Sequence, residues 1–210
     1  MCKMARKIYL EGGGDIRKGE NDHLDRKALN ESKNKKVYIL DLTSNDREKV
    51  AQYRLSLEEY FRRLGAKKVD FVSTSQSLNE IEEKLMSAGV VYIPGGDTEV
   101  LINNLKHRKI SSLLINLESI FVGNSAGAMV LCNEAICAYE KRGIIDGLGL
   151  VGIAIDVHYD KTHDKKLNEL SKKREMYAIP EGSAIIFKNG KLSFIGNIYK
   201  FSNKKKIKIN

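Results

Sequence analysis

Long apolar runs, paired cysteines and linker-like segments are all missing from this sequence of 210 residues. No apolar run approaches the roughly 18 residues of a membrane-spanning helix, which excludes that class of protein. Residues 1–15 carry positive charges but only a short apolar run, so we expect no secretory signal and a cytoplasmic protein.

The three cysteines, Cys2, Cys132 and Cys137, form an odd set without a CxxC spacing. Neither a disulfide framework nor a thiolate metal site is therefore indicated. We expect Cys132 and Cys137 to be thiols of the core. A metal site built from His158, His163 and the neighbouring aspartates is not expected either, because their spacing fits no ligand pattern.

The formal net charge of +9 raises the question of a nucleic-acid partner. The excess of lysine and arginine is spread over residues 33–36, 161–174 and 200–208, without a nucleic-acid motif. We therefore expect a solvated basic surface, a carboxyl-terminal tail that only adds solubility, and neither a nucleic-acid nor a membrane partner.

No repeat of fixed period and no long Pro-, Ser- or Gly-rich linker divides the chain. A chain of this length buries most of its surface when it folds around one core. We therefore expect a single domain over residues 1–210.

Short β-rich runs alternate with helical patterns in the first two thirds of the chain. The expected strands are 6–11, 36–42, 68–73, 90–93 and 119–122, and the expected helices are 47–64, 78–87, 97 or 98 to 105, and 126–131. This order predicts an α/β fold, a mostly parallel central sheet with helices on both faces.

After residue 134 the pattern changes, because β-rich runs follow one another with a single charged helix among them. The expected strands are 135–139, 153–157, 176–179, 184–187 and 192–195, and the expected helix is 163–174. We predict a partly antiparallel carboxyl-terminal extension of the sheet.

Residues 123–128, Gly-Asn-Ser-Ala-Gly-Ala, carry the strongest signal for chemistry. An apolar strand precedes them and a helix-compatible run follows. In this strand-turn-helix arrangement, a nucleophile elbow, a strained turn presents a serine hydroxyl between small neighbours. We predict that Ser125 is a nucleophile; a tight turn with a capping serine is the alternative.

A serine hydroxyl is a weak nucleophile and needs a base. His158 follows a β-rich run, so it can project from a strand end at the same edge of the sheet as Ser125. His163 is the rival, but it begins a charged helix and is expected to be exposed. His23 and His107 lie in polar segments. We predict His158 as the base.

The base in turn needs a carboxylate that fixes its tautomer and stabilises its protonated form. Glu140 follows a short strand, whereas Glu181 lies on a tight turn between a proline and a glycine. Spacing does not separate these two candidates.

Two glycine clusters also follow predicted strands. Residues 94–98 read Pro-Gly-Gly-Asp-Thr, and glycines before a helix let a ligand approach the backbone amides closely. We assign the amides of Gly96 and Ala126 to an oxyanion hole. The cluster at 12–14 lacks a dinucleotide fingerprint, so we expect it to line the same edge as a loop.

The motifs YLEGGGD, YFRRLGA, IPGGDT, GNSAGAM, DVHYD and IPEGSAI, taken in order from Ile8 to Phe187, resemble peptidase family S51. Its members include aspartyl dipeptidase, also called peptidase E, and cyanophycinase. PGGDT and GNSAGA are the most specific of these motifs. The resemblance implies a flavodoxin-like fold similar to class I glutamine amidotransferases, with serine in place of their cysteine, and a Ser-His-acid mechanism on peptides that contain aspartate.

Within this resemblance the catalytic serine of the family falls on Ser125 and its histidine on His158. The acid depends on the branch: the match to peptidase E falls on Glu140, where aspartate is usual, and the cyanophycinase-like match falls on Glu181.

The sequence departs from cyanophycinases after DVHYD. Their arginine-rich stretch is replaced here by Lys161, Lys165 and Lys166, with Arg174 further on. A lysine ammonium cannot copy the bidentate grip of an arginine on a carboxylate, so the motifs leave the substrate less defined than the chemistry.

The sequence thus predicts a serine hydrolase that cleaves short peptides with an amino-terminal or β-linked aspartate through a Ser-His-Glu triad and an acyl-enzyme. We expect a small peptide as its partner and no cofactor or metal; a monomer and a homodimer both remain open. The expected substrate-binding residues are Gly95, Asp97, Thr98, Asn124, Lys161 and Arg174.

Two alternatives remain. One is a small esterase. The other is a non-catalytic protein that binds an anion or another small ligand on the same fold with the glycines at 12–14 and 95–96.

Overall fold

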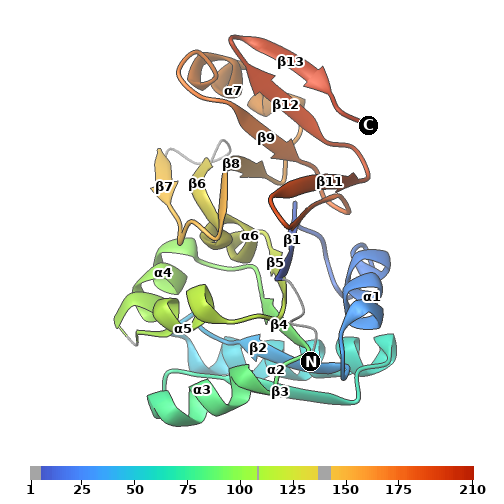
Figure 1. The fold of residues 1–210 in the computed structure, drawn as a ribbon, viewed down its shortest axis with the longest axis vertical. Coiled ribbons are helices and arrows are strands. Elements are labelled where there is room, and N and C mark those ends of the chain that lie inside the picture. The colour runs from blue at the N-terminus through green and yellow to red at the C-terminus, as the bar shows by residue number, and fades with distance from the viewer. Residues whose placement is uncertain (1–5, 108, 137–142) are drawn as a thin grey trace.

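The computed structural model describes residues 6–107, 109–136 and 143–210. The described strands form two sheets, one of seven and one of six strands. In Figure 1 the six-stranded sheet lies above the seven-stranded sheet, and most helices surround the lower one.

The first sheet has the strand order β11-β10-β1-β5-β4-β2-β3. The five strands β1, β5, β4, β2 and β3 are parallel to one another. The strand β10 pairs antiparallel with both β1 and β11. The strands are β1 (Lys7–Glu11), β2 (Lys36–Leu40), β3 (Lys68–Val72), β4 (Val90–Ile93), β5 (Ile120–Asn124), β10 (Ala184–Lys188) and β11 (Lys191–Ile195).

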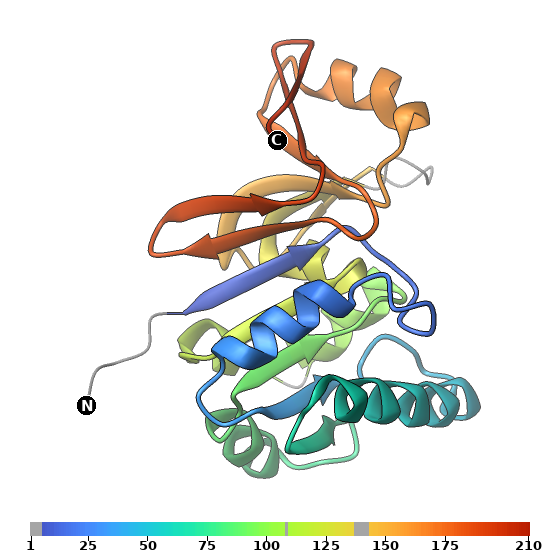
Figure 2. The same ribbon diagram turned by 90° about the vertical axis from the view of Figure 1, so that its right-hand side faces the viewer.

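Helices cover both faces of this sheet because successive strand residues point to opposite sides. Ile8 and Leu10 of β1 pack in one core with α3 to α6, and Tyr9 packs in a second core with α1 and α2. Figure 2 shows α1 and α2 on the same side of the sheet. The helices are α1 (Asp22–Glu31), α2 (Arg47–Leu64), α3 (Leu78–Met86), α4 (Thr98–His107), α5 (Ile110–Asn116) and α6 (Ala126–Leu131).

The second sheet has the order β13-β12-β9-β8-β6-β7, with parallel pairing of β8 to β6 and β9. Ile155 and Ile179 of this sheet belong to the same core as Ile8, which joins the two sheets. Its elements are β6 (Cys132–Ile136), β7 (Ile144–Asp146), β8 (Val151–Val157), the 3₁₀ turn η1 (Lys161–His163), α7 (Asp164–Leu170), β9 (Met176–Ile179), β12 (Tyr199–Ser202) and β13 (Lys205–Lys208).

The ends of the helices follow from local chemistry. The Asp46 carboxylate accepts the amide hydrogens of the first turn of α2, and Gly65 ends that helix at a left-handed φ of +100°. Asp97, rather than Thr98, caps α4 by accepting the amide hydrogens of Glu99 and Val100. Among the described residues, no helix has both the length and the apolar character that a bilayer crossing requires.

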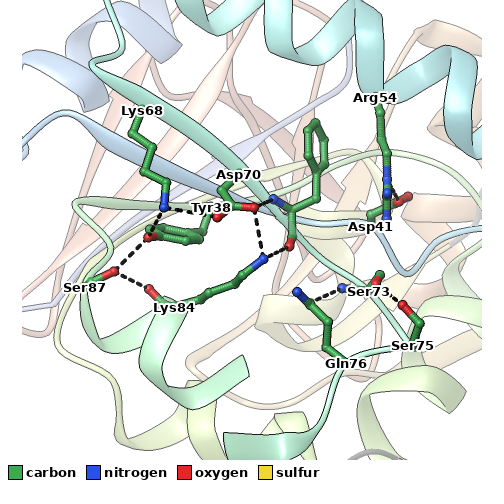
Figure 3. A network of polar contacts seen from close by, with 11 residues as sticks. Tyr38, Asp41, Arg54, Lys68, Asp70, Ser73, Ser75, Gln76, Lys84 and Ser87 are labelled. Atoms are coloured by element: carbon green, nitrogen blue, oxygen red, sulfur yellow. Dashed lines mark hydrogen bonds and ion pairs between the residues drawn. The ribbon is translucent and has the colours of Figure 1, made fainter. Parts of the chain in front are cut away.

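Polar contacts fasten α3 to the edge strand β3. Lys84 Nζ lies 2.9 Å from Asp70 Oδ1, and Lys68 Nζ lies 3.2 Å from Asp70 Oδ2 (Figure 3). Near the same edge of the sheet, Arg54 of α2 pairs with Asp41, which follows β2 (Figure 3). Such partly exposed ion pairs contribute about 0–1 kcal/mol each, so they orient the edge more than they stabilise it.

The predicted α/β class, with a mostly parallel first sheet, is confirmed. The strands of the expected antiparallel extension belong to two different sheets. The strands β10 and β11 join the first sheet, and the remaining late strands form the second sheet around the parallel strands β6, β8 and β9. Helices α1 and α5 were not predicted. Cys132 is buried, as expected, whereas Cys2 and Cys137 lie outside the described residues.

The expectation of a merely solubilising tail is wrong. Residues 199–208 form the hairpin of β12 and β13, in which Phe201 is fully buried. Lys206 Nζ lies 3.0 Å from Asp164 Oδ2 and 4.7 Å from the centre of the Tyr199 ring. Lys206 therefore links the hairpin to α7, because its ammonium contacts both the carboxylate of Asp164 and the aromatic face of Tyr199.

Candidate active site

Ser125 stands on a strained turn between β5 and α6. Its φ of +52° is in the left-handed region that side chains other than glycine rarely adopt. Two glycines allow the turn to be this tight. A Cβ on Gly123 would lie 2.5 Å from the carbonyl carbon of Gly127, and a Cβ on Gly127 would lie 1.9 Å from the Ile93 carbonyl oxygen. The Gly-x-Ser-x-Gly spacing therefore has a steric cause.

Three side chains form a hydrogen-bonded row at this turn. Ser125 Oγ lies 2.7 Å from His158 Nε2, and His158 Nδ1 lies 2.7 Å from Glu181 Oε1. The three residues come from the end of β5, the end of β8 and the turn between β9 and β10. The structure thus brings together the predicted nucleophile, the predicted base and one of the two predicted acids. The other, Glu140, lies outside the described residues.

The carboxyl end of β1 joins the segments that carry this row. Three consecutive backbone carbonyls accept hydrogen bonds from backbone amides: Glu11 from Ser125 (3.1 Å), Gly12 from His158 (2.6 Å) and Gly13 from Gly182 (3.3 Å). One short loop therefore sets the relative positions of all three segments. Sequence reasoning missed this role, and the run of three glycines was the signal that could have found it.

The His158 ring lies directly against Gly13. A Cβ on Gly13 would lie 2.2 Å from His158 Cε1, and the φ of +119° at Gly13 is unfavourable for other residues. His158 itself has a left-handed φ of +51°, so its ring position depends on this packing rather than on a relaxed backbone.

We expect Gly13→Ala to lower kcat/KM by about 100-fold or more, because the added methyl group must displace the imidazole from Ser125. Steady-state kinetics on the best available substrate measures this effect. Gly65→Ala is the matched control: its φ is also left-handed, at +100°, but no atom lies within 4 Å of the added Cβ. Equal activities of the two variants would contradict the positioning role of Gly13.

The second glycine cluster lies beside the nucleophile. A Cβ on Gly95 would lie 3.5 Å from Ser125 Cβ, whereas a Cβ on Gly96 would meet the side chain of Thr43 at 2.7 Å. Gly95, Gly96 and Asp97 line one pocket. Ala126 is the first residue of α6, directly after Ser125.

Several predicted substrate-binding residues are placed elsewhere. The Thr98 side chain is buried, and its hydroxyl donates to Met129 Sδ in the core. Asn124 is also buried. Arg174 pairs with Glu134 and precedes β9, so it lies at the opposite end of that strand from the Glu181 turn. The structure does not bring Arg174 to Ser125.

Lys161 is exposed in η1, a short distance along the chain from His158. The expectation that His163 is exposed is wrong: it is buried, and its Nδ1 lies 2.7 Å from the buried Asp156 Oδ2. The helical segment begins earlier and more tightly than predicted, as the 3₁₀ turn η1, and the His163 side chain at the end of this turn is buried.

Two carboxyl groups are buried beside the end of β1, those of Glu11 in β1 and Asp25 in α1. Burial raises the pKa of Glu11 well above its usual range, and the nearby Asp25 raises it further, against a hydrogen bond from Asn21. Burial likewise raises the pKa of Asp25 to about 7, although the Tyr60 hydroxyl donates to its carboxylate at 2.6 Å. For both groups, burial thus favours the protonated carboxyl over the carboxylate, beneath the backbone that holds Ser125.

Within the described part of the chain, no group of three or more His, Cys, Asp or Glu side chains is arranged to hold a metal ion. The side chains of Ser125, His158 and Glu181 are instead hydrogen-bonded in a row. Their arrangement of hydroxyl, imidazole and carboxylate is the one by which a base activates a serine and an acid orients the base.

Comparison with known proteins found similar sequences and similar folds. The sequence model of peptidase family S51 matches residues 8–195. An uncharacterized peptidase of Listeria monocytogenes is 26% identical over 164 residues, which cover 70% of this chain and 79% of the relative.

Two solved structures share the fold. The crystal structure of a peptidase from an acI-B1 actinobacterium superposes with a TM-score of 0.75 at 16% identity, over 99% of this chain and 95% of that chain. A protein of Listeria monocytogenes described as a peptidase E superposes with a TM-score of 0.71 at 20% identity, over 91% of this chain and 98% of that chain.

Proposed function

Since the chain belongs to peptidase family S51, as its motifs predict, we propose that it is a serine peptidase that cleaves short peptides through Ser125, His158 and Glu181. The observation that carries the proposal is the unbroken hydrogen-bonded row from Ser125 Oγ through the imidazole to the Glu181 carboxylate. Each neighbouring pair in this row is at hydrogen-bonding distance, which is the geometric requirement for proton transfer.

In the proposed reaction the Ser125 hydroxyl attacks the carbonyl carbon of the scissile peptide bond, and His158 Nε2 takes the hydroxyl proton. Glu181 accepts a hydrogen bond from the His158 Nδ1–H, which selects the tautomer whose Nε2 is a base and stabilises the imidazolium. The imidazolium then protonates the leaving amine, and an acyl-enzyme remains on Ser125. Water hydrolyses this ester with His158 again as the base.

The negative charge on the carbonyl oxygen needs donors in place before the attack. We assign this task to the amides of Ala126 and Gly96. Gly95 supports the assignment, because a Cβ added to it would be in van der Waals range of the Ser125 side chain and it precedes Gly96 in the same turn. Fixed backbone amides need no reorganisation during the reaction, so they stabilise the tetrahedral intermediate more than the planar substrate.

We propose dipeptides and other short peptides with an amino-terminal or β-linked aspartate as substrates. The motifs shared with peptidase E support this class, as does the description of the Listeria structure as a peptidase E. An acidic substrate also suits a chain with a formal net charge of +9, since opposite charge increases the rate of encounter.

The experiment that tests the proposal is incubation of the full chain with a panel of Asp-X and isoaspartyl dipeptides, with release of the free amino acids measured by chromatography. Cleavage of at least one member is expected. Hydrolysis of a p-nitrophenyl ester without cleavage of any dipeptide would instead support a small esterase.

A further inference from the structure

A pocket of about 350 Å³ is lined in part by Gly95 and Gly96, which follow β4. Its walls come from the β4–α4 turn, the β2–α2 loop and the first turns of α2. The lining residues on which the argument depends are Gly95, Gly96, Asp41, Asp97, Lys49 and Tyr53. Since a Cβ added to Gly95 would lie 3.5 Å from Ser125 Cβ, a substrate whose carbonyl group reaches the serine can extend its acyl-side residue toward this pocket.

The charged side chains that line this pocket differ in how firmly other groups of the protein hold them. Asp41 is paired with Arg54 (Figure 3), and Asp97 accepts two amide hydrogen bonds as the cap of α4. Lys49 is the only lysine or arginine among the described residues that line the pocket. Its ammonium is 3.7 Å from Asp46, and its side chain is 80% exposed. The two lining carboxylates thus have fixed partners, whereas the ammonium has freedom to meet a ligand.

A second pocket of about 340 Å³ is also lined by Lys49 and Tyr53 of α2. The two residues are four positions apart in α2, so they lie on one face of the helix. Arg17, the arginine of this second pocket, is held by both oxygens of Asp15. The ammonium of Lys49 is therefore a cation shared by two pockets, one of which is also lined by Gly95.

We infer that Lys49 determines specificity by binding the free carboxylate of the acyl-side aspartate, in the pocket beside Gly95. This carboxylate is the side-chain group in an α-linked peptide and the α-carboxylate in a β-linked one. This inference rests on the proposed peptidase function and replaces Lys161 and Arg174 as the expected source of the positive charge. The flexible lysine stem reaches carboxylates at more than one depth, which suits both an α-linked and a β-linked aspartate. Sequence reasoning had no signal for it, because an exposed lysine early in a helix looks like any solvated position.

The test compares Asp-X with the isosteric neutral Asn-X dipeptide in wild type, Lys49→Met and Lys27→Met. Lys27 is an exposed α1 lysine paired with Glu31 and serves as the matched control. We expect Lys49→Met to lower kcat/KM for Asp-X by about 10- to 100-fold, the usual loss for a hydrogen bond to a charged group, with little change for Asn-X. Lys27→Met should retain the wild-type preference.

A binding measurement makes the result independent of turnover. With Ser125→Ala as the background, calorimetry should show that Lys49→Met weakens Asp-X binding by the same factor and leaves Asn-X binding unchanged. An equal loss for both peptides, no loss for either, or collapse of the preference in Lys161→Met but not in Lys49→Met would overturn the inference.

Failure of the proposed function has a different signature. A fluorophosphonate probe carries no acidic side chain, so it should label wild type and Lys49→Met equally. Absence of labelling together with absence of dipeptide cleavage in wild type would reject the serine peptidase, whereas normal labelling with an unchanged Asp-to-Asn preference in Lys49→Met would reject only the role of Lys49.

Discussion

Replacement of Ser125 by alanine is expected to lower kcat by about a million-fold and to abolish labelling by a fluorophosphonate probe. The hydroxyl is the only atom in the hydrogen-bonded row that can form the acyl-enzyme, and loss of the nucleophile alone costs a serine peptidase nearly all of the benefit of its triad. Residual activity over the uncatalysed reaction would come from the oxyanion amides and from substrate binding.

Ser112→Ala is the control for this prediction, because Ser112 is an exposed residue of α5. It should retain wild-type kinetics and labelling. Mass spectrometry of the labelled peptide identifies the modified residue directly. Substantial turnover by Ser125→Ala, or a label on a different residue, would show that the reaction does not pass through this serine.

Glu181→Gln should lower kcat by about a thousandfold or more, with a much smaller change in KM. Glutamine preserves the size of the side chain but removes the charge that stabilises the imidazolium, and its amide group can hold the imidazole in the wrong tautomer. The expected split follows because Glu181 acts through His158, from 2.7 Å away, and not through the substrate. Steady-state kinetics at saturating substrate measures it.

Glu140→Gln is the matched comparison for this variant. Glu140 is the other acid that the sequence leaves open, and we expect its replacement to change kcat little. A thousandfold loss in Glu140→Gln with a small loss in Glu181→Gln would reverse the assignment of the acid. Small losses in both would mean that neither glutamate orients the base.

Much of the first sheet was predictable because its signals are local. The apolar positions of α2 recur at helical spacing, and Gly65 directly after them marks the end of the helix correctly. Short apolar strands between helices predict parallel pairing with crossover connections. Ser125 was recognisable for the same reason, since a tight strand-to-helix turn needs small residues at fixed positions.

The second sheet was harder to predict because its strands pair across long separations in the chain. The β9 strand pairs with β8 on one side and with β12 on the other, and α7 lies in the chain between β8 and β9. No local pattern distinguishes a solvated basic tail from a hairpin whose Phe201 fills a core. The inward position of His163 likewise depends on Asp156 of β8.

The parallel strands of the first sheet, and the predictions of Ser125 as nucleophile and His158 as base, thus followed from periodicity and from steric demands within a few residues. The choice between Glu140 and Glu181 was different, because it depends on which turn approaches the His158 ring after folding. That approach is governed by the carbonyls of Gly12 and Gly13, which bind segments far away in the chain. Hydrogen bonds between distant segments leave no periodic trace in a sequence, so only the packed structure could bring Glu181 to the imidazole.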